Sequence, residues 1–106
     1  QALVYDDEIA TGGTTLELAR QLIDHGIEEI WIACTHGVFV HGALERLVDI
    51  PQIVKVVATD TVPIPEEKRH PKLEILSVAN VFGEAIRYNY LKRSIGDLFV
   101  FGGNSC

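Results

Sequence analysis

Short apolar runs alternate along this chain with segments whose apolar residues recur at helical spacing. The runs that predict strands cover residues 2–5, 29–34, 55–58 and 73–78. Helical spacing begins near Thr14 and ends at His25, and it returns over residues 42–48 and 81–93, with a short helical turn at 95–99. This alternation predicts βαβ units, and therefore an α/β fold in which helices flank a parallel sheet in three layers.

The ends of the expected helices carry recognisable signals. Thr14 is followed three residues later by Glu17, which is the spacing of a capping box. Gly26 lies where a helix commonly ends, and Asn80 precedes the last helix as a candidate N-cap. Residues 63–71 contain three prolines and are expected to form an exposed connection.

The turn between the first strand and the first helix has the composition of an anion-binding loop. Gly12 and Gly13 lack Cβ atoms, so the backbone can approach a ligand and adopt a positive φ. The helix that follows presents unpaired N–H groups and a partial positive charge at its N-terminus. Hydroxyl groups are also abundant in this turn. We therefore expect a phosphate to bind at Ala10, Thr11, Gly12, Gly13, Thr14 and Thr15.

Three acidic residues directly before this loop need a separate explanation. Asp6, Asp7 and Glu8 would repel a bare phosphate. The conflict is resolved by a ligand with two ends, such as a phosphorylated pentose. Its phosphate would bind the loop, and the carboxylates of Asp6 and Asp7 would accept hydrogen bonds from sugar hydroxyls or hold Mg²⁺ through bound water. The alternative is an ordinary strand, turn and capped helix without a ligand.

Polar residues also follow two further strands of the expected sheet. Thr35 and His36 end one strand, and Thr59 and Asp60 end another. Because the carboxyl ends of parallel strands meet at one edge, these residues should converge with the acidic pair on a single cleft. His36 and Asp60 are candidate cleft residues, although a structural hydrogen bond for His36 and a turn cap for Asp60 are the more common roles.

Composition excludes several classes of function. The chain has 106 residues, is 47% hydrophobic and carries a formal charge of −6, which argues against a nucleic-acid partner. No apolar run has the length needed to cross a membrane, so we expect no membrane partner. Two cysteines do not make a disulfide scaffold and fit a cytoplasmic location; Cys34, among apolar residues, is expected in the core rather than as a nucleophile.

The segment from Val4 to Thr14 resembles the phosphoribosyl diphosphate motif of the type I phosphoribosyltransferase fold. Within that superfamily the chain looks most like the ribose-phosphate diphosphokinases, because three further segments, residues 33–39, 59–63 and 76–87, resemble segments of that family in the same order. Ala10 departs from the pattern, since many members have Asp there. The backbone N–H survives this change, but one contact to a hydroxyl or to Mg²⁺-bound water is lost.

The resemblance implies an enzyme of nucleotide biosynthesis. It would transfer a diphosphoryl group from ATP to ribose 5-phosphate with Mg²⁺, giving phosphoribosyl diphosphate and AMP, as a homo-oligomer (dimer or hexamer) in the cytoplasm. Residues 1–100 would form the domain that binds ribose 5-phosphate, and residues 101–106 a disordered tail. The chain starts at Gln1, from which we infer a fragment that lacks the N-terminal ATP-binding portion.

The catalytic residues are expected in the missing portion, because the resemblance places the ATP pocket and a catalytic loop with Lys and Arg before the acidic pair. In sequence order the first cation after the loop is Arg20, inside a helix, so we expect no cation near the loop. The chain alone should then bind without catalysing. Two alternatives remain open: a base-salvage or orotate-type phosphoribosyltransferase, and a non-catalytic homologue that binds a partner protein.

Overall fold

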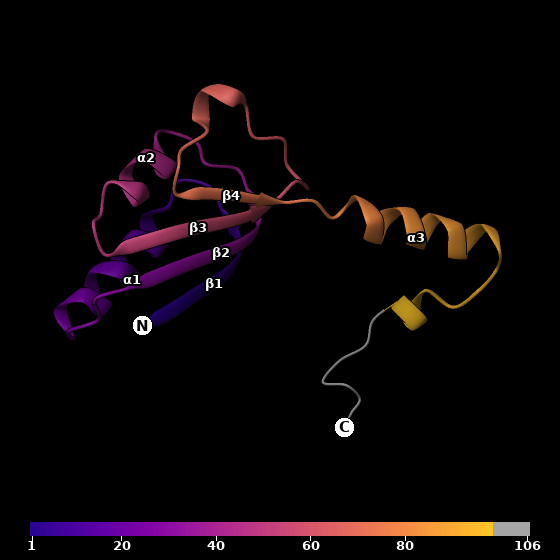
Figure 1. Ribbon diagram of the computed structural model, residues 1–106, viewed down its shortest axis with the longest axis horizontal. Helices are drawn as coiled ribbons and strands as arrows, with labels where there is room; N and C mark the ends of the chain where they lie inside the picture. Colours follow the sequence, from indigo (N-terminus) through magenta and orange to yellow (C-terminus); the bar gives the residue numbers. More distant parts are fainter. Residues whose placement is uncertain (99–106) are drawn as a thin grey trace.

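The computed structural model describes residues 1–98 and contains a parallel sheet whose strands follow the chain order β1-β2-β3-β4 (Figure 1). The elements are β1 (Ala2–Ile9), α1 (Gly13–Asp24), β2 (Ile30–Gly37), α2 (Ala43–Val48), β3 (Ile53–Thr59), η1 (Glu66–Lys68), β4 (Leu73–Leu76), α3 (Ala79–Tyr90) and η2 (Ile95–Leu98). The predicted α/β class with a parallel sheet is confirmed. The expectations for Phe99 and for residues 101–106 lie outside the described residues.

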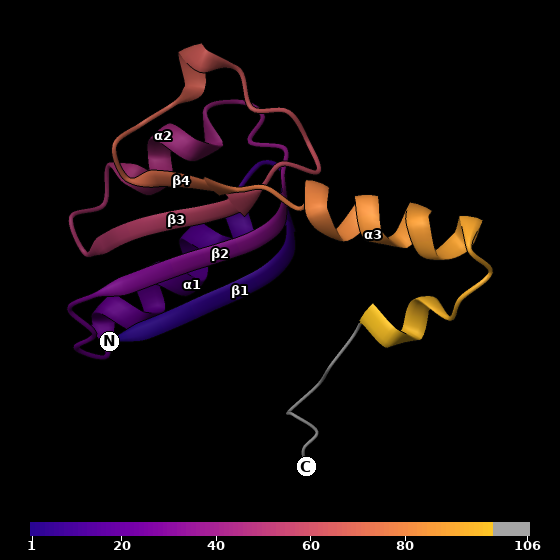
Figure 2. The ribbon, with the colours of Figure 1, turned by 45° about the vertical axis from the view of Figure 1, so that its right-hand side comes forward.

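One face of the sheet forms the hydrophobic core. Val4, Ile32 and Val56 are neighbours across β1, β2 and β3, and all three side chains are buried. The helices α1 and α2 lie on this same side of the strands (Figure 2). Leu16 and Leu44 come from these two helices and complete the core with the strand residues. The buried face thus fixes the position of the loop that joins β1 to α1.

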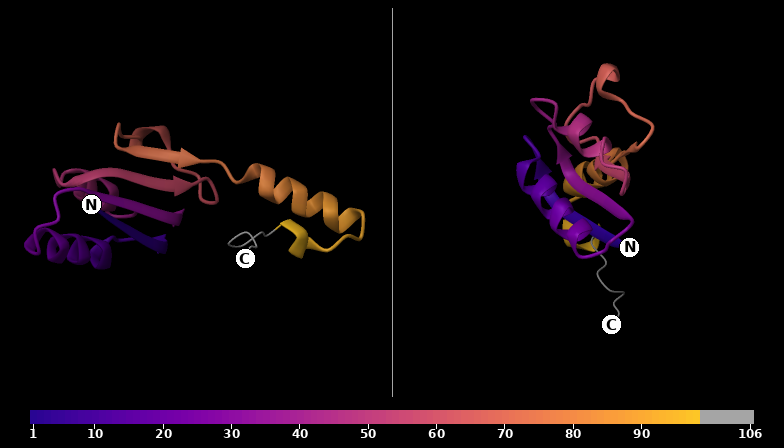
Figure 3. Two further views of the ribbon diagram at one scale, coloured as in Figure 1. Left: turned by 60° about the horizontal axis from the view of Figure 1, so that its bottom comes forward. Right: turned by 90° about the vertical axis from the view of Figure 1, so that its left-hand side faces the viewer.

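The opposite face of the sheet is exposed in the part of the chain that the structure describes. Leu3 and Tyr5 on β1 are 72% and 67% exposed, and Trp31 on β2 is 39% exposed. The helix α3 does not cover this face, because it extends beyond the end of β4 and packs against η2 (Figure 3). The predicted third layer is therefore wrong for residues 1–98. Successive crossovers of the same hand, running in one direction across the sheet, place α1 and α2 on the same face.

Three strands run further than the apolar pattern indicated, and β3 covers Ile53–Thr59 instead of residues 55–58. β1 continues through its three acidic residues to Ile9, and β2 continues to Gly37. Asp6 pairs with Cys34 and Glu8 pairs with His36 in the parallel ladder. Ladder hydrogen bonds use backbone groups, so polar side chains at the edge of a core do not end a strand. β4, in contrast, ends at Leu76, two residues before the predicted limit of 78.

Both predicted helix N-caps are wrong. α1 starts at Gly13 with Gly12 as N-cap, and no side chain caps it, so Thr14 and Glu17 form no capping box. α3 starts at Ala79 with Val78 as N-cap and ends at Tyr90, instead of covering residues 81–93. The left-handed conformation of Gly12, with φ +80°, turns the chain directly into α1. The predicted end of α1 near His25 and Gly26 is confirmed.

Candidate functional site: a loop at the carboxyl end of β1

A hollow of about 120 Å³ lies where β1 passes into α1. It is lined by Asp6, Glu8, Ile9, Ala10, Thr11, Gly12, Gly13, Thr14 and Thr15. All six loop residues singled out in the sequence therefore surround one space, together with the first of the two aspartates. Glu8 and Ile9 also line the hollow and were not expected as site residues. Asp7 is not among the residues that line it.

The first turn of α1 presents backbone donors to this hollow. The first hydrogen bond within the helix runs from Leu16 N–H to the Gly12 carbonyl oxygen, over 2.8 Å. The N–H groups before Leu16 in this turn consequently have no acceptor inside the helix. No side chain caps this end of α1. An uncapped helix N-terminus that opens into a hollow is suited to binding an anion.

Gly12 and Gly13 contribute to the loop in different ways. A Cβ atom on Gly12 would lie 3.3 Å from the Cβ of Ala43 on α2, and the residue has φ +80°, which side chains rarely tolerate. Gly12 is therefore required both by its backbone conformation and by the close approach of α2. A Cβ atom on Gly13 would meet no atom within 4 Å. Gly13 leaves open space at the start of α1 and is not required by packing.

The two aspartates lie on different faces of the sheet. Successive side chains in a strand point to opposite faces, and Asp6 is beside Cys34 on the side of the core. The Asp6 carboxylate accepts a hydrogen bond from the Asp7 N–H through Oδ1, at 2.8 Å. This bond fixes the Asp6 carboxylate close to the backbone of the next residue. Asp6 is also among the residues that line the hollow.

Cys34 is a core residue and not a nucleophile. Its side chain is only 3% exposed. Burial raises the pKa of the Cys34 thiol to about 11, and the negative charge of Asp6 adds to this effect. The thiol is therefore protonated at neutral pH, and the thiolate is the reactive form of cysteine.

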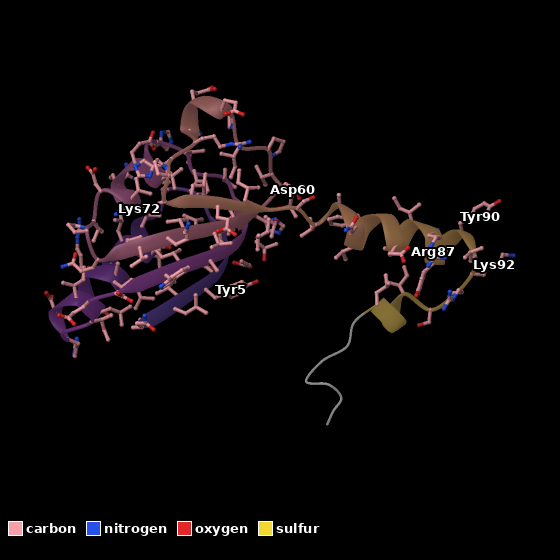
Figure 4. The ribbon with its side chains drawn as sticks, in the orientation of Figure 1. Tyr5, Asp60, Lys72, Arg87, Tyr90 and Lys92 are labelled. Atoms are coloured by element: carbon pink, nitrogen blue, oxygen red, sulfur yellow. The ribbon has the colours of Figure 1, made fainter. Side chains whose placement is uncertain are left out.

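His36 and Asp60 stand at the same edge of the sheet, where both make structural hydrogen bonds. His36 Nδ1 shares a hydrogen bond of 2.7 Å with the hydroxyl of Thr61. Asp60 Oδ1 accepts the N–H of Val78 at 2.9 Å, where the chain leaves β4 for α3 (Figure 4). The Val78 N–H and, next, the Ser77 hydroxyl hold the pKa of Asp60 below its usual value. Neither His36 nor Asp60 lines the hollow at the β1–α1 loop.

The loop has a cationic neighbour that the sequence did not reveal. Arg46 on α2 donates a hydrogen bond from Nη2 to the Thr11 carbonyl oxygen at 2.6 Å, and its Nη1 donates to the His41 carbonyl oxygen. The expectation that no cation lies near the loop is therefore wrong. Arg46 follows Thr11 by 35 residues, and only the packing of α2 beside the loop brings the two together. A cation far from the loop in the sequence is thus a direct neighbour of the loop in the fold.

A metal ion would have to be held here mainly through water. Within residues 1–98, no group of three or more His, Cys, Asp or Glu side chains is arranged to hold a metal ion. The carboxylate oxygens of Asp6 and Glu8 beside the hollow are nevertheless of the type that Mg²⁺ prefers, and Mg²⁺ commonly keeps several waters. Across the same residues, no helix is both long and apolar enough to cross a bilayer.

These features define a parallel α/β domain whose first strand is followed by a glycine-containing loop, an uncapped helix N-terminus and a hollow. A family described as phosphoribosyl synthetase-associated domain matches residues 1–100, and the chain belongs to this family. The chain is 46% identical over 99 residues to ribose-phosphate pyrophosphokinase of Caldanaerobacter subterraneus subsp. tengcongensis. It is 45% identical over 98 residues to the protein of that name from Rhodopirellula baltica.

The chain corresponds to only part of these relatives. The alignments cover 93% and 92% of this chain but 31% of each relative. A crystal structure of phosphoribosylpyrophosphate synthetase from Mycobacterium smegmatis is similar with a TM-score of 0.82 and 35% sequence identity. That similarity covers 87% of this chain and 31% of the solved chain. The chain thus spans about a third of the length of the proteins it matches.

Proposed function

We propose that this chain is the ribose 5-phosphate-binding part of a ribose-phosphate diphosphokinase, which transfers a diphosphoryl group from ATP to ribose 5-phosphate and releases AMP. The observation that carries the proposal is the uncapped N-terminus of α1, which opens with the Gly12 loop into a hollow beside Asp6. Backbone donors on one side and carboxylates on the other match a ligand with a phosphate at one end and hydroxyls at the other. A ribose phosphate is such a ligand.

The binding mode follows from the positions of these groups. The 5-phosphate would accept hydrogen bonds from the backbone of Ala10 to Thr15, with hydroxyls of Thr11, Thr14 and Thr15 as further donors. Asp6, beside the hollow, would accept hydrogen bonds from ribose hydroxyls, directly or through Mg²⁺-bound water. Mg²⁺, when bound, would neutralise charge that develops on the diphosphoryl group. The role of this chain is to hold and orient the acceptor sugar.

The remaining parts of the reaction belong to the portion of the enzyme that this chain does not include. The chain spans 31% of its relatives, which leaves room elsewhere for an ATP pocket and for cationic catalytic side chains. We propose that the complete enzyme is a cytoplasmic homo-oligomer, a dimer or a hexamer. The base-salvage and orotate-type alternative is disfavoured by relatives named pyrophosphokinase over 93% of the chain. The intact loop argues against the non-catalytic alternative.

Crystals soaked with ribose 5-phosphate test this binding mode. The expected result is density for the phosphate against the backbone of residues 10–14, with the ribose ring directed toward Asp6. Soaking with ribose alone provides the control, because a sugar without a phosphate should not occupy the loop. Ligand density at another site, with this loop empty, would contradict the proposal.

A further inference from the structure

Three successive backbone carbonyl groups of the loop accept hydrogen bonds from one neighbouring segment. The Ile9 carbonyl accepts from the N–H of Val38 at 3.0 Å and also from that of Phe39, and the Ala10 carbonyl accepts from the N–H of Val40 at 2.9 Å. The next carbonyl along the chain, that of Thr11, accepts from the Arg46 side chain at 2.6 Å. The carbonyl side of the loop is therefore turned toward residues 38–46.

The opposite side of these peptide groups carries their N–H bonds. In a trans peptide the C=O of one residue and the N–H of the next point in opposite directions, and residues 1–98 contain no cis peptide bond. Thr11 and Gly12 line the hollow, whereas Arg46 does not. Fixing the Thr11 carbonyl toward Arg46 consequently directs the Gly12 N–H away from Arg46, toward the hollow. A carbonyl oxygen facing the hollow would instead repel an anion.

Arg46 differs from the other three donors because it acts through a side chain. Its planar guanidinium can donate to two acceptors at fixed angles, and it does so here to the carbonyls of Thr11 and His41. His41 and Gly42 both have positive φ angles, of 53° and 70°, in the turn that leads into α2. One guanidinium thus joins the loop to the turn that starts α2.

We propose that Arg46 is a positioning residue for phosphate binding: it holds the Thr11 peptide so that the Gly12 N–H faces the bound phosphate. This inference rests on the proposed function, because it takes the hollow as the phosphate site. It assigns Arg46 no contact with the ligand. The positive charge of Arg46 lies beside the loop, where it offsets part of the repulsion that Asp6 and Glu8 would exert on a phosphate.

Three variants separate the effect of the paired hydrogen bonds of Arg46 from the effect of its charge. Arg46→Met removes the charge and the hydrogen bonds but keeps a long side chain, and Arg46→Lys keeps the charge without the planar pair of donors. Arg20→Met is the matched control, because it removes the same charge from an exposed position on α1. Isothermal titration with inorganic phosphate and with ribose 5-phosphate gives the affinities, at a temperature where every variant is folded.

The expected result is that Arg46→Met weakens phosphate binding by about tenfold, Arg46→Lys weakens it by about threefold or more, and Arg20→Met changes it by less than about twofold. Wild-type affinity in Arg46→Met would overturn the positioning role. Wild-type affinity in Arg46→Lys would also overturn it, since charge rather than geometry would then explain any loss. If Arg46→Met does not fold, Arg46→Lys carries the comparison.

A second measurement tests, without a ligand, whether Arg46 holds the Thr11 peptide in a fixed orientation. ¹⁵N relaxation of the ligand-free protein should give a lower order parameter for the Gly12 amide in Arg46→Met than in wild type and in Arg20→Met. An unchanged order parameter would overturn the inference. Wild-type protein that binds inorganic phosphate but not ribose 5-phosphate would count against the proposed function alone. Wild-type protein that binds neither would overturn both.

Discussion

Gly12 is the residue of the loop that is least open to substitution. Gly12→Ala should lower the free energy of unfolding by about 1–2 kcal/mol, because alanine at a positive φ is strained and its Cβ would crowd Ala43. Gly13→Ala is the matched control and should leave stability unchanged or slightly raised, since its Cβ meets nothing within 4 Å. Urea unfolding of both variants makes the comparison. Equal losses from the two substitutions would contradict the distinct roles assigned to these glycines.

Carboxylate charge beside the loop should matter for catalysis in the longer enzyme. Asp6→Asn should lower kcat by at least about tenfold, or about 1.4 kcal/mol of transition-state stabilisation, because its carboxylate would hold ribose hydroxyls or Mg²⁺-bound water. Asp24→Asn, at the exposed end of α1, is the control for loss of one charge. A double Asn variant at positions 6 and 7 with wild-type turnover would show that both acids are structural.

At the scale of single residues the sequence located the loop well, because the features that define it are neighbours in the chain. Gly12, Thr14 and Asp6 lie within a few residues of one another, and all three line the same hollow. Arg46 could not be found in this way, because its link to Thr11 spans 35 residues and depends on how α2 packs. The sequence also did not show that Asp6 and Asp7 face opposite sides of the sheet, because the apolar run predicted a strand that ended before them.

At the scale of elements, Asp60 connects the end of β3 to the start of α3. Hydrogen bonds from the Val78 N–H and the Ser77 hydroxyl lower its pKa in the folded state. A carboxylate with a lowered pKa stabilises the fold at pH values above its unfolded pKa, about 3.9, and this contribution is lost as the pH falls through the folded pKa. The link should therefore persist at neutral pH and weaken only below about pH 3.9.

The amide proton of Val78 reports this link directly. On acidification from pH 6, its chemical shift should change with a midpoint below about 3.9, and Asp60→Asn should abolish the change. Asp49→Asn, at an exposed position after α2, is the matched control and should retain it. A midpoint at or above the ordinary value for aspartate would contradict the hydrogen bond as the cause.

The elements show which parts of a fold local patterns can predict. Strand and helix order followed from apolar spacing, because each element buries a face with its own period. The helix caps did not follow, since Gly12 begins α1 through its backbone conformation and not through a side chain. The number of layers did not follow either. Apolar residues on both faces of β1 indicated a sheet covered on both sides, yet Leu3 and Tyr5 are exposed within residues 1–98.

At the scale of the whole molecule, apolar side chains remain exposed on α3 as well as on the sheet. Phe82, Ile86 and Tyr90 recur at a spacing of four residues and are 57%, 70% and 83% exposed. None of the residues of α3 is buried (Figure 4). Helices of this length are marginally stable in water without tertiary packing. We therefore expect α3 to exchange its amide protons faster than α1, whose Leu16 and Ala19 are buried in the core.

We also predict that this chain does not synthesise phosphoribosyl diphosphate by itself. The guanidinium of Arg46 already donates hydrogen bonds to two carbonyl groups. The formal charge of the chain is −6 and acidic residues precede the loop, so binding of ATP is opposed electrostatically. An assay of AMP formation with ATP, Mg²⁺ and ribose 5-phosphate should detect no turnover for the chain and turnover for the longer enzyme. Comparable rates would mean that the donor site is complete in this chain.

We expect the phosphate of a ribose phosphate to bind to the backbone of the β1–α1 loop. The most direct measurement is a titration of the ¹⁵N-labelled chain with ribose 5-phosphate, followed by parallel titrations with inorganic phosphate and with ribose. The expected result is saturable shifts of the Gly12, Gly13, Thr14 and Thr15 amides with both phosphate-containing ligands, and none with ribose. Shifts of equal size with ribose, or saturable shifts confined to residues outside the loop, would contradict it.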